Sequence, residues 1–321
     1  MFEPLDFSHI KTESLYERKS KVSIADFGKP FNPGGTLADF IGSLPEILAA
    51  GDLRAIVRCL LLARRAGKPI IWALGAHVIK CGLSPVVIDL MRRGWISLIA
   101  LNGAGSVHDA EIALAGKTSE DVPAALADSA FGMARETSEI LNSAAIEAQG
   151  DGTGLGRSIG KRLLAEKALH RDFSILASGA ELSIPITVHV AIGTDIVHIH
   201  PSASGAAIGA ATYTDFKIFC SAVSLLGEGG VILNCGSAVI LPVIFEKALS
   251  VTRNLGYEVS NFTGVNLDFL HQYRTNLNPI QRARDLGGRG FSLTGHHEIM
   301  IPLLAAALLE QEAEVRSQKR G

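Results

Sequence analysis

Short apolar runs alternate with segments of helical periodicity along most of the chain. The runs at 69–75, 95–102 and 231–235 are predominantly apolar, which is typical of strands buried on both faces of a parallel sheet. Further strands are expected at 184–192 and 257–267. Between the strands, apolar residues recur three and four positions apart, which indicates amphipathic helices. The expected helices are 36–49, 53–66, 83–93, 108–116, 157–168, 174–181, 206–226, 237–254 and 296–314, with further helical segments within 118–148.

This alternation predicts an open, doubly wound α/β sheet with at least five parallel strands and right-handed crossovers. Residues 1–34 are charged and weakly periodic and end in KPFNPGG, so we expect an N-terminal arm there. Residues 35–316 are expected to form a single α/β domain. A charged tail is expected at 317–321.

Composition indicates a globular protein with an aliphatic core. The chain has 321 residues, of which 47% are hydrophobic and 6% aromatic, and a formal net charge of -2. Because charges of both signs are interleaved, neither nucleic acid nor a membrane surface is expected as a partner. The apolar runs are too short to span a bilayer, and the four cysteines form no C-x-x-C pair. We therefore expect a cytoplasmic protein with reduced thiols.

An open α/β sheet binds ligands outside the carboxyl ends of its strands. The segments that follow the expected strands are rich in small and polar residues, which let backbone N–H groups approach a phosphate or ribose. This pattern favours a nucleotide-like ligand. The segments are GAHVIKCG from Gly75, NGAGSVHD from Asn102, GTDIVHIHP from Gly193, NCGSA from Asn234 and NFTGVNLD from Asn261.

Histidines gather at the same strand ends. His108 and Asp109 follow the second strand, and His296 opens the last helix, where it either faces a ligand or caps the helix. His198 and His200 are two positions apart, which would place both imidazoles on one face of an extended segment as candidate zinc ligands. The alternative is that such histidines bond to the backbone and line a wet crevice. Spacing fixes no third metal ligand, which favours this alternative.

The glycine-rich segment GDGTGLGRSIG at 150–160 imitates a dinucleotide-binding fingerprint. Its spacing is G-x-G-x-x-x-G, and the residues before it have a helical pattern, whereas the fingerprint follows a strand. We therefore expect a joint between two helices at this point.

Several pieces of sequence occur in a characteristic order: FGKPF, the turn from Gly75, AGSVHD, IGKRLLAEKALHRDFSILASGAELSIPITVHVAIGTD, GGVILNCGSAV and IMIPLLAAALL. Over roughly residues 25–310 this order resembles the deoxyhypusine synthase family. The resemblance implies a Rossmann-like, NAD-binding parallel sheet of about six to seven strands flanked by helices. It also implies a homotetramer with NAD bound at dimer interfaces.

The resemblance further implies which turns hold NAD. Residues 104–109 look like the family's A-G-G-V-E-E turn, so that Asp109 would accept the ribose hydroxyls. GTD at 193–195 is similar to the T-D-G turn, CGS at 235–237 to the G-G-G turn, and NFT at 261–263 to the N-T pair. The expected cofactor-binding residues are Gly75, Asn102, Gly103, Gly105, Ser106, Asp109, Gly193, Thr194, Asn234, Gly236, Ser237 and Thr263.

The family passes the butylamine group of spermidine to an enzyme lysine as an imine. Its W-G-K segment falls near LGGRGF at 286–291, so Arg289 stands nearest the lysine position. Arginine stays protonated and cannot form that imine. The gap in this alignment leaves Lys247 or another lysine free to approach the site. The resemblance therefore implies an NAD-binding enzyme that acts on a polyamine or related small amine, by aminobutyl transfer or oxidation, rather than authentic deoxyhypusine synthesis.

Two other functions stay open. One is a metal-dependent hydrolase or lyase in which His198 and His200 hold a divalent metal such as zinc. The other is a non-catalytic binding protein. For the amine enzyme, aspartates are expected to hold ammonium groups and a histidine to move a proton. Its expected catalytic residues are His108, Asp195, Arg289 and His296.

Overall fold

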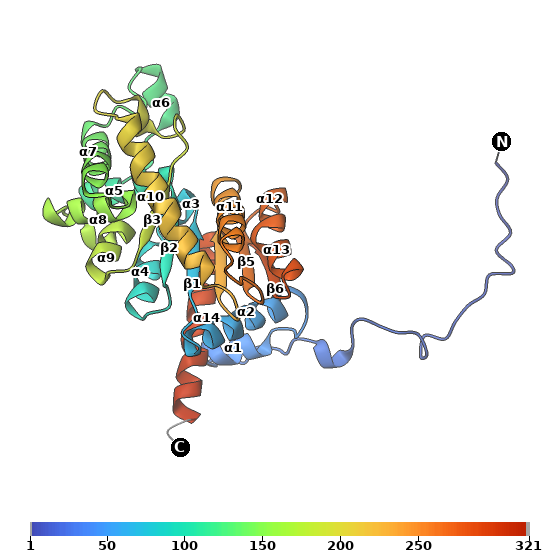
Figure 1. The fold of residues 1–321 in the computed structure, drawn as a ribbon. Helices are drawn as coiled ribbons and strands as arrows, with labels where there is room; N and C mark the ends of the chain where they lie inside the picture. Colours follow the sequence, from blue (N-terminus) through green and yellow to red (C-terminus); the bar gives the residue numbers. More distant parts are fainter. Residues whose placement is uncertain (1, 319–321) are drawn as a thin grey trace.

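A computed structural model describes residues 2–318 and contains one six-stranded parallel sheet flanked by helices (Figure 1). The strand order is β3-β2-β1-β4-β5-β6, so the chain starts at the centre and winds outward twice. The predicted open, doubly wound sheet is confirmed. The strands are β1 (Ile70–Leu74), β2 (Leu98–Asn102), β3 (Ile186–His189), β4 (Val231–Cys235), β5 (Thr263–Asp268) and β6 (Arg289–Thr294).

Alternate residues of the central strand enter two separate cores. Trp72 and Leu74 pack in one core, while Ile71 and Ala73 pack in the other. Because side chains alternate between the faces of a strand, a strand covered on both faces must be apolar at every position. This explains the uninterrupted apolar run that predicted β1.

The helices largely follow the apolar periodicity, with shifts at their ends. The last one runs on to Gln318, and residues 319–321 of the expected charged tail lie outside the described residues. The α-helices are α1 (Leu37–Ser43), α2 (Leu48–Arg65), α3 (Ala76–Lys80), α4 (Ser84–Arg92), α5 (Gly103–Ala115), α6 (Val122–Ala127), α7 (Arg135–Asp151), α8 (Leu155–Ala165), α9 (Ile175–Leu182), α10 (Gly205–Ser224), α11 (Ile240–Asn254), α12 (Tyr273–Thr275), α13 (Arg282–Asp285) and α14 (His297–Gln318). The shorter elements are the 3₁₀ turns η1 (Ile24–Asp26), η2 (Arg171–Phe173) and η3 (Ile196–Ile199) and the π-helical η4 (Asn276–Gln281).

The chain before α1 extends away from the sheet and contains the short turn η1 (Figure 1). The expected joint at 150–160 is the connection between α7 and α8, where Gly152 has a φ of 66°. Within residues 2–318, no helix combines the length and the apolar composition needed to cross a bilayer.

The last two strands differ from the prediction. The strand expected at 257–267 begins only at Thr263, and β6 was not expected at all. The two strands pair in parallel from Thr263 with Arg289 to Asp268 with Thr294. Thr263 and Arg289 therefore lie at the amino ends of their strands, at the edge of the sheet opposite to the one that binds ligands in this fold.

Helix α10 covers the outer edge of β3. Asp215 accepts hydrogen bonds from the N–H of Val188 at 2.8 Å and from the N–H of Gly156 in α8 at 2.9 Å. Thr212 accepts from the N–H of Val190 at 3.0 Å and donates to the carbonyl of Val188 at 2.7 Å. Backbone groups at a free edge would otherwise stay unpaired. These two side chains take the place of a seventh strand.

The buried Asp215 makes stability depend on pH. Burial raises the pKa of Asp215 to about 7, although backbone hydrogen bonds oppose the rise. In the folded state the carboxyl keeps its proton at pH values where the unfolded chain has lost it, so its contribution to stability falls between about pH 4 and pH 7. The free energy of unfolding of Asp215→Asn, taken relative to that of the unmodified protein, is expected to be roughly 2 kcal/mol higher at about pH 8 than at about pH 5. Urea unfolding of both proteins at the two pH values measures this change, and a constant difference would contradict it.

Candidate functional site

A cavity of about 210 Å³ lies beyond the carboxyl ends of β2 and β3. Its charged and titratable lining consists of Lys80, His108, Glu111, Glu120 and Asp195. These residues come from α3, from α5 and from the two loops that follow α5 and β3. The cavity therefore lies where ligands bind in an open parallel sheet, and carboxylates outnumber amines in its wall.

His108 and Glu111 face the cavity together because they lie three positions apart on α5. The Thr118 hydroxyl donates to Oε2 of Glu111 and lies 2.6 Å from Nδ1 of His108. Since the hydroxyl proton goes to the carboxylate, Nδ1 of His108 must donate, so the lone pair of the neutral imidazole lies on Nε2. Burial acts to raise the pKa of Glu111, but hydrogen bonds from His108 and Thr118 outweigh it and hold that pKa below its ordinary value. The site thus holds an imidazole base oriented by an ionised glutamate.

Asp195 lies against the first turn of α5. A Cβ added to Gly103, the first residue of that helix, would lie 1.8 Å from Oδ2 of Asp195, so only glycine leaves room for the carboxylate. Burial raises the pKa of Asp195, and the neighbouring imidazoles of His198 and His108 partly oppose the rise. A helix N-terminus favours an anion. At the N-terminus of α5, the side chain of Asp195 occupies the position that a bound anion would take.

The turns after β1 and β4 close on each other at the centre of the sheet. The N–H of Gly75 donates to the carbonyl of Cys235 at 2.8 Å, and a Cβ on Gly75 would lie 2.1 Å from the carbonyl oxygen of Gly236. Gly236 has a φ of 71° and lies against His297, whose Nε2 is 3.2 Å from the carbonyl of Leu267. The glycines at this point are required by contact between two loops of the protein.

Aromatic rings surround this closed point. The ring of Phe269 lies 5.7 Å from that of His77, 6.0 Å from that of His297 and 6.5 Å from that of His296, with the last pair nearly parallel. Nε2 of His77 lies 3.3 Å from Sγ of Cys81. Burial raises the pKa of the Cys81 thiol, and a nearby carboxylate raises it further. The pair therefore lacks the thiolate that a cysteine nucleophile needs.

Predicted residues around the second strand build the start of α5. The side-chain oxygen of Asn102 accepts from the N–H of Gly105 at 2.9 Å, and the Ser106 hydroxyl donates to the carbonyl of Gly103 at 2.7 Å. Both are local bonds that begin a helix. Of the turn after β3, Thr194 lines the cavity beside Asp195.

Asn234 and Ser237 hold the turn after β4. The Asn234 amide donates to the carbonyl of Ser237 at 3.0 Å and to Oδ1 of Asn266 at 2.8 Å. The Ser237 hydroxyl accepts from the N–H of Leu241 at 3.2 Å, in the first turn of α11. These residues give the turn its shape, and neither belongs to the lining of the cavity at β2 and β3.

The prediction that Asp109 accepts ribose hydroxyls is wrong. Its side chain is fully buried and accepts hydrogen bonds from the Ser174 hydroxyl at 2.5 Å and from the N–H groups of Ile175 at 2.7 Å and Leu176 at 3.1 Å. Burial raises the pKa of Asp109 to about 6, and these bonds oppose the rise. Both carboxylate oxygens are committed to the N-terminus of α9.

Thr263 and Arg289, predicted as a cofactor-binding and a catalytic residue, are not brought to this cavity. They pair with each other at the amino ends of β5 and β6, away from the cavity. His296 is exposed on the ring of Phe269 and does not line the cavity either. Arg289 had been assigned by alignment to the family's lysine segment, but it is the first residue of the edge strand β6.

The expected geometry of the histidine pair is wrong as well. His198 belongs to the 3₁₀ turn η3 and not to an extended segment, so it does not share a strand face with His200. Nδ1 of His198 accepts from the N–H groups of Gly193 at 3.1 Å and Asp195 at 3.2 Å, while Nδ1 of His200 lies 2.9 Å from the Ser202 hydroxyl. Within residues 2–318, no three histidine, cysteine or acidic side chains are grouped as metal ligands. His198 bonds to the backbone, which is what the sequence offered as the alternative to a metal ligand.

Three charged residues of the cavity were missed from the sequence. Glu111 had a signal, since it follows His108 by three positions in an expected helix. Lys80 lies in the segment from Gly75, whose small residues and not its lysine indicated a ligand. Glu120 comes from a loop, where it accepts a hydrogen bond from the N–H of Gly132 at 2.7 Å. Lys247 lies outside this lining and pairs with its neighbouring glutamate at 3.7 Å. Lys80, and not Lys247, is the lysine that reaches the cavity.

Comparison with known proteins bears on the fold alone. No family model matches the chain, and neither does any curated protein. Among solved structures, a conserved protein of Methanococcus maripaludis S2 assigned as LOR/SDH has a TM-score of 0.52 and 16% identity over 88% of this chain and 72% of that one. The ternary complex of AgrE with ornithine and NAD+ has a TM-score of 0.51 and 17% identity over 82% of this chain and 33% of AgrE. The chain has a Rossmann-like fold.

The same comparison leaves the family open. A protein of Entamoeba histolytica assigned as a deoxyhypusine synthase covers 87% of this chain and 95% of its own, with a TM-score of 0.49 and 11% identity. That likeness is too low to support membership of the family. The chain also spans only about a third of AgrE, so the activity of AgrE does not transfer with the Rossmann-like fold.

The residues predicted to hold NAD are not arranged to bind a dinucleotide in this structure. A Rossmann-like fold places the pyrophosphate at a glycine turn and helix N-terminus beside the central strands. Here the turns after β1 and β4 touch, Asp195 holds the start of α5, and Asp109 faces inward. The cavity of about 210 Å³ is also below the roughly 300–1,000 Å³ typical of pockets for drug-sized ligands.

Proposed function

We propose that the protein is a Rossmann-like enzyme that takes a small cationic amine in the cavity beyond β2 and β3. The charge of the cavity wall carries this proposal, because Glu111, Glu120 and Asp195 oppose the single cation of Lys80. Carboxylates facing a partly desolvated space favour a bound cation. Ornithine, the amine in the AgrE complex, is a ligand of this chemical class.

His108 supplies the proton chemistry. Its Nε2 accepts a proton from the bound ammonium, which leaves an imidazolium and frees the nitrogen lone pair of the amine. Val107, Phe131 and Ile196 provide an apolar wall for the methylene groups. The resemblance to the deoxyhypusine synthase family supplies the finer part of the proposal, which is a polyamine or related substrate and aminobutyl transfer or oxidation as the reaction. Both reactions need a hydride acceptor, so this finer part depends on a conformation in which the turns after β1 and β4 separate and admit NAD.

Calorimetric titration with 1,4-diaminobutane tests the amine site. We expect saturable binding that weakens about tenfold or more in Glu111→Gln, because a contact with a charged group contributes about 1.5–3 kcal/mol. Glu258→Gln, which removes an exposed carboxylate from a distant loop, is the matched control and should bind as the unmodified protein does. Equal binding of the neutral 1,4-butanediol, or unchanged affinity in Glu111→Gln, would contradict the proposal. Binding without turnover of any polyamine would favour the non-catalytic reading.

NAD is tested by a separate titration. In the conformation described, we expect no saturation up to about 1 mM, because the glycine turns are closed and carboxylates occupy the anion positions. Saturable binding would mean that the turns after β1 and β4 separate. It would then support NAD as the oxidant for the bound amine.

The homotetramer and the cytoplasmic location remain predictions. Light scattering on the purified protein measures the number of chains in each particle. Four chains would support the assembly that the resemblance implies.

A further inference from the structure

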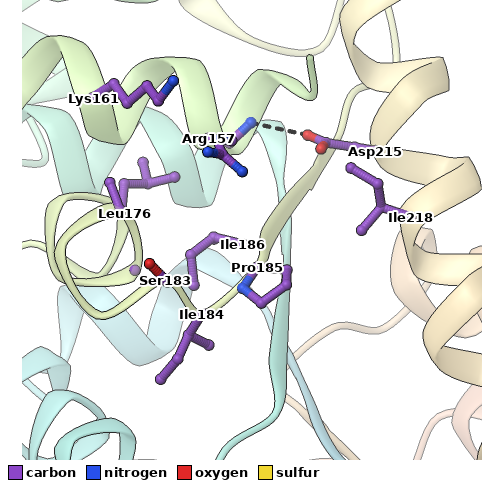
Figure 2. Close-up of a pocket in the computed structure, with 12 residues that line it drawn as sticks. Arg157, Lys161, Leu176, Ser183, Ile184, Pro185, Ile186, Asp215 and Ile218 are labelled. Atoms are coloured by element: carbon purple, nitrogen blue, oxygen red, sulfur yellow. Dashed lines mark hydrogen bonds between the residues drawn. The ribbon is translucent and has the colours of Figure 1, made fainter.

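A second cavity, of about 160 Å³, lies at the amino end of β3 (Figure 2). Its walls come from α8, α9, the turn into β3, and α10. The loop that carries Asp195 leaves the other end of this strand, so the two cavities lie at opposite ends of β3. The proposed amine chemistry uses no residue of the second cavity.

The floor of this cavity is aliphatic and rigid. Leu176, Ile184, Ile186 and Ile218 line it (Figure 2). Close contacts fix the surrounding elements, because a Cβ on Gly156 of α8 would lie 2.0 Å from the carbonyl oxygen of Ile186. The helix and the strand therefore meet without room for adjustment, and the apolar surface keeps its shape.

Two cations on one face of α8 border the cavity. Figure 2 shows Arg157 between Leu176 and Asp215, with Lys161 beside it on the same helix. Both side chains are exposed. Like charges four positions apart destabilise a helix. By contrast, Arg162 on the same helix is bound by two glutamates.

Asp215 does not neutralise these cations. It is almost fully buried, and its Oδ2 accepts from the N–H groups of Gly156 and Val188. Its Oδ1 has no hydrogen-bond partner within residues 2–318. A Cβ on Gly154 would lie 1.9 Å from Oδ1, so that oxygen is directed at the start of α8. The carboxyl is thus held by backbone groups, and the two cations remain available to a ligand.

We propose that this cavity binds a small molecule with an aliphatic chain and a carboxylate group. The carboxylate lies on Arg157 and Lys161, since a guanidinium bonds to a carboxylate through two parallel hydrogen bonds. The chain packs on Ile184, Ile186 and Ile218. A volume of about 160 Å³ equals that of about five water molecules in the liquid, which suits a chain of about five carbons.

Titration with pentanoate tests the proposal, read from the methyl signals of isoleucine-labelled protein. We expect saturable shifts at Ile184, Ile186 and Ile218 with a dissociation constant on the order of 1 mM. The double variant Arg157→Gln/Lys161→Gln should bind about tenfold more weakly or worse, because both charged contacts are lost. Its unfolding midpoint should be unchanged or slightly higher, since a like-charge pair is removed.

Two controls keep the test specific. Arg65→Gln removes one exposed cation at the end of α2 and should leave pentanoate binding unchanged. Pentanamide has nearly the same shape without the charge and should not saturate the site. Equal binding of pentanamide, equal binding by the double variant, or shifts confined to other methyl groups would each overturn the proposal.

Discussion

Replacing Asp109 with alanine is expected to lower the free energy of unfolding by about 3 kcal/mol or more. The substitution leaves the Ser174 hydroxyl and the N–H groups of Ile175 and Leu176 without an acceptor inside the protein. Each unsatisfied buried group costs about 1–3 kcal/mol. Urea unfolding near neutral pH measures the loss. As a control, Asp89→Ala removes an exposed aspartate paired with Arg93 and should change stability by less than about 1 kcal/mol.

The same variant separates a structural from a cofactor role. If Asp109 held a ribose, its removal would leave stability near that of the unmodified protein and lower the affinity for NAD. A stable Asp109→Ala protein would therefore contradict the position found here. The free energy of unfolding of Asp109→Asn should lie between those of the unmodified protein and Asp109→Ala, because an amide keeps one acceptor oxygen and places a donor near N–H groups.

Gly75→Ala is expected to destabilise the protein by about 3 kcal/mol, since the added methyl meets a fixed backbone atom. Its Cβ would lie 2.1 Å from the carbonyl oxygen of Gly236, and no side-chain rotation relieves that contact. The turns after β1 and β4 would have to separate. Urea unfolding again measures the effect.

Gly42→Ala is the matched control for Gly75→Ala. Gly42 lies in α1 with open space around its Cα, so alanine should stabilise the protein by up to about 1 kcal/mol through helix propensity. If Gly75→Ala were as stable as the unmodified protein, the glycine would not be required by contact between the loops. A role in admitting a ligand would then be favoured.

Most of the sheet was predictable because its central strands are covered on both faces. Such strands are mostly apolar, and β1 and, apart from Asn234, β4 show this directly in the sequence. The edge strand β6 buries only some of its residues, and its RGFSLT segment has no comparable run. Its position depends on pairing with β5, which local sequence does not encode.

The candidate site was predictable as a place but not residue by residue. His108 and Asp109 are adjacent on α5, so their side chains point about 100° apart and only one can face the cavity. Ser174 and the start of α9, more than sixty positions further along the chain, bind Asp109 and leave His108 to face the cavity. Glu120 likewise enters the cavity from a loop whose path depends on tertiary packing.

The covering of β3 by α10 also limits how copies of the chain can associate. The backbone groups of Val188 and Val190 that a neighbouring molecule would need for strand addition are already bonded to Asp215 and Thr212. A continuous intermolecular sheet through this edge is therefore blocked. Loss of either side chain would leave backbone groups at this edge unpaired and able to bond to a strand of another molecule. A variant without Asp215 or Thr212 is therefore expected to become insoluble before it loses activity.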